Sequence, residues 1–295
     1  MKNITLLPGF VFFRKTVGLV AAGVILVAAV AVFSQDRIRK PAVAGQFYPD
    51  NPADLRKDVE SFASGGKTLS SAPKMLICPH AGYEFSGPVA GKGFAAIDRS
   101  VSTVIILGPP HHVWVHGIAA PGAEWFETPL GKVAVDTARV NRLLRSKAAY
   151  EDPAAHAPEH SLEVELPFLQ VRLGAFEIVP LLVNDIDPQV AANAIFPLID
   201  RHTLVIASSD LSHFFTHEEA RKIDDRTIAN ILAGRDADSI VACGAMPIRV
   251  VMRLAAMMLL TPVLLDARTS FDTAPQYGPG RVVGYASIAY VKKRP

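Results

Sequence analysis

The sequence predicts an α/β protein: a single domain with a largely parallel or mixed central sheet flanked by helices, preceded by an N-terminal hydrophobic helix. From residue 41 onward, short β-rich runs alternate with helical patterns, an order typical of a sheet covered by helices. The short runs are almost continuous in Val, Ile and Leu, as in strands buried on both faces. Residues 36–295 show no internal repeat or low-complexity linker, so we expect one large domain there.

The expected elements follow one another along this domain. Each predicted strand is a short apolar run, and each predicted helix is a longer segment with apolar residues at helical spacing. The predicted strands are Met75–Cys78, Val101–Leu107, Glu177–Val183, Thr203–Ala207, Val263–Asp266 and Val282–Tyr290. The predicted helices are Asp54–Ser61, Gly87–Ile97, Asp136–Arg145, Leu162–Leu173, Pro188–Leu198, His217–Leu232 and Pro247–Leu259.

Residues 17–33 form an uncharged apolar run that follows two basic residues, the layout of an export signal or a signal anchor. As a helix, the run would reach roughly 25 Å, just short of a bilayer's hydrocarbon core. Residues 29–31 would suit signal peptidase, but the bulky residues that follow favour an uncleaved anchor within residues 1–35. We therefore expect a membrane-anchored protein with an extracytoplasmic domain. The alternatives are export after signal cleavage and a buried core helix.

Composition and motifs exclude several classes of function. The 30 basic and 28 acidic residues are interleaved and give a net charge of +2, so we expect no nucleic-acid partner. Neither a phosphate-binding glycine loop nor a Gly-x-Ser-x-Gly motif is present, which argues against a nucleotide cofactor and against serine-hydrolase chemistry. Cys78 and Cys243 are too few for a disulfide framework, although a single bridge between them stays an alternative.

Polar residues follow three of the predicted strands. His80 comes after the first strand, His111 after the second, and Asp210 and His213 after the fourth. In open α/β sheets ligands bind beyond the carboxyl ends of the strands, so we expect these residues to converge. Imidazoles and a carboxylate gathered in a cleft suit a divalent first-row metal. Asp210 and His213 would share one face of a helical turn, where they could also act without metal as a base and its orienting acid.

Two further segments carry candidate polar residues. In the segment 159–165, Pro158 supports a helix start, and His160 and Glu163 are one turn apart, which would place them on one face. Acidic residues that complement a helix dipole are an equally good interpretation of this segment. Cys243 lies in a loop that leads into a predicted helix, where a thiolate would be stabilised by the dipole, although a buried inert thiol is the simpler alternative.

Seven ordered motifs resemble those of the Memo family, whose prokaryotic members are often called AmmeMemoRadiSam system protein B. The resemblance spans nearly all of residues 41–291 and implies a fold like that of class III extradiol dioxygenases, which use a mononuclear non-haem Fe(II). The motifs are Ala44-Gly-Gln-Phe-Tyr-Pro49, Pro79-His-Ala-Gly-Tyr83, Leu107-Gly-Pro-Pro-His-His112, Glu159-His-Ser-Leu-Glu163, Leu166-Pro167, Ser208-Ser-Asp-Leu-Ser-His213 and Cys243-Gly-Ala-Met-Pro247.

The resemblance assigns roles to individual residues. It implies His80, His111 and Cys243 as metal ligands, with Asp210 and His213 lining the same pocket, where we expect them to act as acid–base groups. We expect the further residues that contact substrate or support the ligands to be His160, Glu163, His112 and Tyr83.

The sequence departs from the family pattern in two places. Pro110 stands where a Ser is commoner, which removes a small hydroxyl beside His111. The N-terminal apolar segment is unusual for a mostly cytosolic family, so we do not carry over the adaptor role of its eukaryotic members.

The leading hypothesis is a non-haem metal-dependent oxidoreductase that uses Fe(II) or copper on a small-molecule or peptide ligand. A thiolate ligand in place of a carboxylate would favour copper or redox cycling over ring cleavage. The first alternative is a non-enzymatic protein that binds a peptide or small ligand in the same pocket. The second is a metal-assisted hydrolase.

Overall fold

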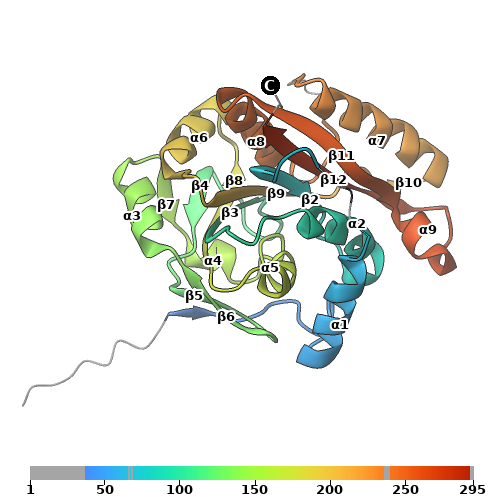
Figure 1. Cartoon of the computed structure of the whole chain (residues 1–295), viewed down its shortest axis with the longest axis horizontal. Coiled ribbons are helices and arrows are strands. Elements are labelled where there is room, and N and C mark those ends of the chain that lie inside the picture. The colour runs from blue at the N-terminus through green and yellow to red at the C-terminus, as the bar shows by residue number, and fades with distance from the viewer. Residues whose placement is uncertain (1–36, 66, 68, 236–239, 293–295) are drawn as a thin grey trace, which may run out of the picture. The chain divides into compact units, whose positions relative to one another are not determined.

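The computed structural model describes residues 37–65, 67, 69–235 and 240–292, which form an α/β fold around a 12-stranded mixed sheet. Five neighbouring strands in its centre run parallel, in the order β6-β8-β3-β9-β2. Figure 1 shows the sheet crossing the middle of this region. The strands are β1 Ile38–Arg39, β2 Met75–Cys78, β3 Thr103–Gly108, β4 Gly117–Ala120, β5 Trp125–Thr128, β6 Gly131–Val135, β7 Ala149–Glu151, β8 Glu177–Asn184, β9 Thr203–Ser208, β10 His213–Phe215, β11 Leu260–Thr269 and β12 Val282–Lys292.

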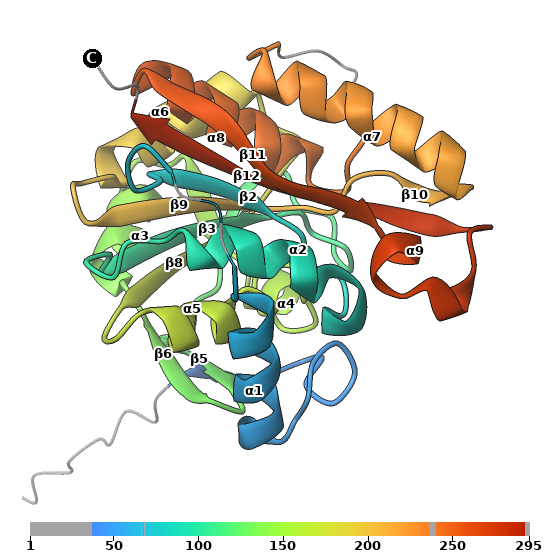
Figure 2. The same cartoon turned by 45° about the vertical axis from the view of Figure 1, so that its right-hand side comes forward.

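Helices cover both faces of the sheet (Figures 1 and 2), which confirms the predicted architecture. One side carries α1, α2 and α5, and the other carries α6, α7 and α8. The helices are α1 Pro52–Phe62, α2 Tyr83–Ala95, α3 Thr137–Arg145, α4 Pro153–His156, α5 Leu166–Arg172, α6 Pro188–Ile195, α7 His217–Leu232, α8 Ala245–Met257 and α9 Ser270–Thr273, with single 3₁₀ turns at Phe196–Leu198 and Pro275–Tyr277.

The central strands are rich in apolar residues on both faces, so both faces are favourably buried. Every residue of β2, β3 and β9 is buried, as expected for strands covered by helices on both sides. The register aligns their ends, since Cys78 of β2 pairs with Ser208 of β9 and Leu107 of β3 pairs with Ala207. Residues that follow these strands therefore emerge side by side at one edge of the sheet.

Two local predictions were wrong. The helix expected over 162–173 begins only at Leu166. Residues 161–165 form turns instead, and their side chains are buried. The residues from Asp210 to Ser212 are not helical, and His213 begins strand β10, so Asp210 and His213 do not share a helical turn.

The predicted N-terminal hydrophobic helix over residues 17–33 lies outside the described residues. Within the ranges that the structure describes, no helix has the length and apolar character needed to cross a membrane.

Candidate metal centre

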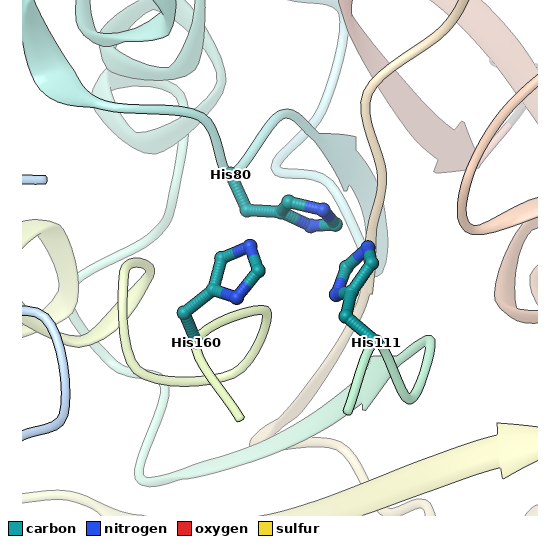
Figure 3. A group of neighbouring side chains, drawn as sticks. All are labelled: His80, His111 and His160. Atoms are coloured by element: carbon teal, nitrogen blue, oxygen red, sulfur yellow. The ribbon is translucent and has the colours of Figure 1, made fainter. Parts of the chain in front are cut away.

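Three histidines meet at the carboxyl edge of the central strands. His80 follows β2 by two residues and His111 follows β3 by three. His160 comes from the loop between α4 and α5. Figure 3 shows the three rings directed toward one another from these separate segments. His80 and His111 thus lie at the edge of the sheet where the predicted strands end.

The three imidazoles are close enough to share one ion. The ring centroid of His80 lies 5.2 Å from that of His111 and 5.5 Å from that of His160. The rings of His111 and His160 are stacked, with their centroids 4.6 Å apart. One nitrogen from each ring can be chosen so that all three lie within 4.8 Å of one another. His80 is buried, and the His111 side chain is 28% exposed, so the group is open to solvent on one side.

Partners behind the rings hold two of the imidazoles in place. Nδ1 of His80 is 2.7 Å from the hydroxyl of Ser208, and Nδ1 of His111 is 2.9 Å from a carboxylate oxygen of Glu159. Each Nδ1 is therefore engaged on the protein side, so Nε2 of each ring is the nitrogen available to bind a metal ion. Metal-binding histidines are typically oriented by such a contact of the second ring nitrogen.

Glu159 is an ionised carboxylate that organises the loop. It is fully buried as a side chain and accepts hydrogen bonds from the backbone amides of His111, His160 and Ser161. Burial alone would raise the pKa of Glu159, but hydrogen bonds from the ring and amide of His111 and from Ser161 outweigh it and hold the pKa well below its usual range. As an acceptor, the carboxylate fixes the proton of His111 on Nδ1.

The site favours neutral imidazoles. Burial and the neighbouring rings of His111 and His160 lower the pKa of His80 well below its usual value. Burial lowers the pKa of His160 to about 4, against a smaller opposing effect from Glu159. At neutral pH these rings therefore carry lone pairs rather than charge, which is the form that binds metal.

A second donor group shares His80. It contains His80, Asp210 and Cys243, whose ligand atoms also lie within 4.8 Å of one another. Sγ of Cys243 is 3.3 Å from Nε2 of His80. Asp210 accepts a hydrogen bond of 2.9 Å from the backbone amide of His80, and burial raises the pKa of Asp210 to about 7.

Of the two alternatives for Cys243, a stabilised thiolate and a buried thiol, the metal-free protein favours the buried thiol. Helix α8 does begin two residues later, but burial and the neighbouring Asp210 raise the pKa of Cys243 to about 12. The group is therefore a thiol at neutral pH. A metal ion would have to displace its proton to bind the sulfur.

Comparison with known proteins identifies the chain. The family model described as Memo-like protein matches residues 39–289. The chain belongs to the Memo-like family. A MEMO1 family protein of Methanopyrus kandleri is 36% identical over 284 residues, which cover 85% of this chain and 98% of that protein. MEMO1 family proteins of Metallosphaera sedula and Aquifex aeolicus are 36% and 32% identical, over 85% and 86% of this chain and 99% and 100% of their own lengths.

Other predicted residues of this Memo-like protein lie at or beside the imidazoles. The ring of His112 is 6.0 Å from that of His160, and His112 is exposed. Nδ1 of His213 lies 2.9 Å from the carbonyl of Leu211, and burial lowers the pKa of His213.

Glu163 and Tyr83 form contacts elsewhere. The Glu163 carboxylate accepts hydrogen bonds from Arg39, from the amides of Ala42 and Val43, and from the Tyr48 hydroxyl. These contacts connect residues 39–48 to the loop before α5. Glu163 and His160 therefore do not lie on one helical face, as their spacing had predicted. Tyr83 donates its hydroxyl proton to the carbonyl of Val164 at 2.8 Å, and its ring packs on Phe168.

Two residues of the Memo-like site were missed by the sequence argument. Glu159 was noted only as part of an acidic stretch, and Ser208 only as part of a family motif. Glu159 offered a weak signal, because it directly precedes His160 in the sequence. Ser208 offered a better one, because it ends a buried strand next to a strand that delivers a histidine.

Proposed function

We propose that this Memo-like protein is a non-haem metal-dependent oxidoreductase. His80 and His111 would bind iron or copper through Nε2, with Cys243 as a third ligand, next to a site for a small-molecule or peptide substrate. The observation that carries the proposal is that one ring nitrogen each of His80, His111 and His160 converge, while Nδ1 of His80 and of His111 is held from behind; the group that contains Cys243 shares His80. Lone pairs directed at a common point repel one another unless a cation lies between them, so the residues fit a metal ion.

The donor types support iron or copper. Imidazole binds zinc, copper and iron well, and a cysteine sulfur beside it adds a soft ligand that favours copper(I) or iron over magnesium or calcium. When bound, such an ion supplies electron transfer and polarisation of a ligand. The motif resemblance to proteins with an extradiol dioxygenase fold points to the same class of chemistry.

Asp210 is the side chain best suited to hold a proton next to the centre. Its pKa of about 7 makes both protonation states accessible near neutrality, which is the requirement for acid–base action. His213, three residues later, has a lowered pKa and is therefore neutral at pH 7. We propose that Asp210 exchanges the proton with a bound substrate and that His213 assists it.

The proposal is tested by metal analysis of anaerobically purified protein, followed by oxygen-uptake measurements over a panel of phenols and thiols. We expect about one iron or copper ion per chain, and loss of both the metal and the uptake in the double variant His80→Ala/His111→Ala. The matched control is His202→Ala, at a partly exposed histidine whose Nδ1 contacts the carbonyl of Ser100. Metal-free protein with no uptake, or uptake that persists in the double variant, would disprove the proposal.

One observation favours a second candidate. A set of three histidines, such as His80, His111 and His160, is the ligand set of some catalytic zinc sites that activate a water molecule. A metal-assisted hydrolase would turn over esters or amides with zinc and would need no oxygen. Tight ligand binding with no turnover under either condition would instead support a binding protein.

A further inference from the structure

A buried chain of hydrogen-bonding groups lies behind His80. Nδ1 of His80 contacts Oγ of Ser208 at 2.7 Å, and the same Oγ contacts Oε1 of Glu165 at 2.7 Å and the carbonyl of Ser161 at 2.6 Å. Ser208 and Glu165 have no exposed surface, and His80 is 1% exposed. Glu165 is separated from the imidazoles by Ser208, and the proposed function gives it no role.

Counting hydrogens decides which group donates. The Ser208 hydroxyl has one hydrogen and two lone pairs, so with three partners it donates once and accepts twice. The carbonyl of Ser161 can only accept, so it receives the Ser208 hydrogen. His80 must then donate from Nδ1, and Glu165 must donate from a protonated carboxyl. This arrangement satisfies all three contacts at once.

The surroundings of Glu165 agree with the protonated form. Its second oxygen, Oε2, is buried and has no hydrogen-bond partner among the described residues. A carboxylate would leave negative charge there without a partner, which is unfavourable in the protein interior. Burial raises the pKa of Glu165 to about 8 and outweighs the opposing effect of the hydrogen bond with Ser208, and the nearby Asp210 adds a smaller raising contribution.

We propose that Glu165 and Ser208 are positioning residues for His80: Glu165, as a neutral carboxylic acid, donates to Ser208, and Ser208 in turn accepts the Nδ1 proton of His80. Nε2 of His80 is then left as a lone pair facing Cys243 and the other imidazoles. The tautomer is fixed before any metal arrives. Only the consequence for metal affinity rests on the proposed function.

The tautomer is measured on metal-free protein by long-range ¹⁵N–¹H NMR of the histidine rings, with the His80 signals assigned from His80→Gln. We expect the Nδ1–H form in the wild type and a mixture containing the Nε2–H form in Ser208→Ala. The matched control is Ser287→Ala, at another fully buried serine, which donates to the carbonyl of Val89. An Nε2–H tautomer in the wild type, or an unchanged tautomer in a folded Ser208→Ala protein, would overturn the proposal.

The state of Glu165 is measured separately by infrared difference spectroscopy of wild type against Glu165→Gln at pH 6. We expect a carbonyl stretching band of a protonated carboxylic acid in the wild type that is absent from the variant. Its absence from the wild type would overturn the proposal. This measurement needs no substitution at Ser208, so it decides the matter even where Ser208→Ala does not fold.

The effect on the metal is read with Co²⁺ alone, by visible absorption. We expect Ser208→Ala to bind Co²⁺ about 10–100-fold more weakly, as is typical when the partner of a metal-binding histidine is removed. Glu165→Gln keeps an N–H donor for Ser208 and should stay near wild type, whereas Glu165→Leu removes the donor and should bind more weakly. Equal affinities in all four proteins would overturn the role in metal binding. A wild type that binds no Co²⁺ would count against the proposed function. The tautomer and infrared measurements, which use metal-free protein, would still decide the positioning role of Ser208 and Glu165.

Discussion

Two buried glutamates support the imidazole group, Glu159 as a carboxylate and Glu165 as a neutral carboxylic acid. Glu159 accepts four hydrogen bonds, from the ring of His111 and from three backbone amides, and its charge is matched by these donors. Glu165 has one partner, Ser208, and one oxygen without any among the described residues. The number of donors around each carboxyl therefore decides whether it is ionised.

This difference predicts a pH dependence of folding. The pKa of Glu165 is about 8 in the folded protein and about 4.3 in an unfolded chain. Between these values the folded state binds more protons than the unfolded state, so the contribution of Glu165 to stability is complete below pH 4 and falls as the pH rises toward 8. We expect wild type to lose on the order of 3 kcal/mol relative to Glu165→Gln between pH 5 and pH 8.

Urea unfolding of both proteins at several pH values measures this difference. The lowered pKa values of His80 and His160 give a slope of the opposite sign, but they are common to both proteins and cancel in the comparison. A constant difference in the free energy of unfolding across this range would show that Glu165 is ionised in the folded protein at pH 5.

Single residues differed in how well the sequence predicted them. His80 and His111 follow buried strands, so their position at the sheet edge could be inferred from strand order alone. Glu163 could not be placed, because its main partner, Arg39, is 124 positions away and no local spacing indicates the contact. Helical spacing paired Glu163 with His160 because it assumed a helix that begins only at Leu166.

At the scale of elements, the site depends on how closely the loop before α5 approaches β3. Ser161 donates its hydroxyl proton to the carbonyl of Pro109 at 2.9 Å, which ties this loop to the segment that carries His111. Gly108, the last residue of β3, allows the approach. A Cβ atom there would lie 2.5 Å from Oγ of Ser161 and 2.7 Å from Cδ2 of Leu162.

Gly108→Ala should therefore displace the loop that carries Glu159 and His160. The loop must move away from β3, and Glu159 and His160 move with it. We expect a loss of about 1–3 kcal/mol in the free energy of unfolding from overpacking, and about tenfold weaker Co²⁺ binding because Glu159 no longer holds His111. Titration with Co²⁺ and urea unfolding measure the two effects.

Gly174→Ala is the matched control, because a Cβ atom at Gly174 would meet nothing within 4 Å. Wild-type Co²⁺ affinity in Gly108→Ala would mean that the imidazoles do not depend on the close contact between the loop and β3.

Across the described domain, the sequence predicted four of the five parallel central strands and the antiparallel pair β11 and β12, and it missed β6 and the short strands. Strands β3, β8 and β9 are long apolar runs, buried along almost their whole lengths, and this is what made them recognisable. Strand β7 has three residues and none is buried, so neither composition nor periodicity marks it. It pairs with β4, and that pairing depends on contacts between segments about 30 positions apart rather than on local pattern.

The candidate ligands come from segments that only the folded chain brings together, so metal binding should stabilise the whole domain. His80, His111, His160 and Cys243 lie in four different loops. A ligand that binds only the folded state at a hundred times its Kd adds about 2.7 kcal/mol, which corresponds to a rise of about 5–10 °C in Tm for a domain of this size. We expect this rise with Fe²⁺ under anaerobic conditions and its reversal by a chelator, measured by differential scanning calorimetry. The double variant His80→Ala/His111→Ala should show no rise, whereas His202→Ala should match wild type. An equal rise in the double variant would locate the bound metal away from the strand ends.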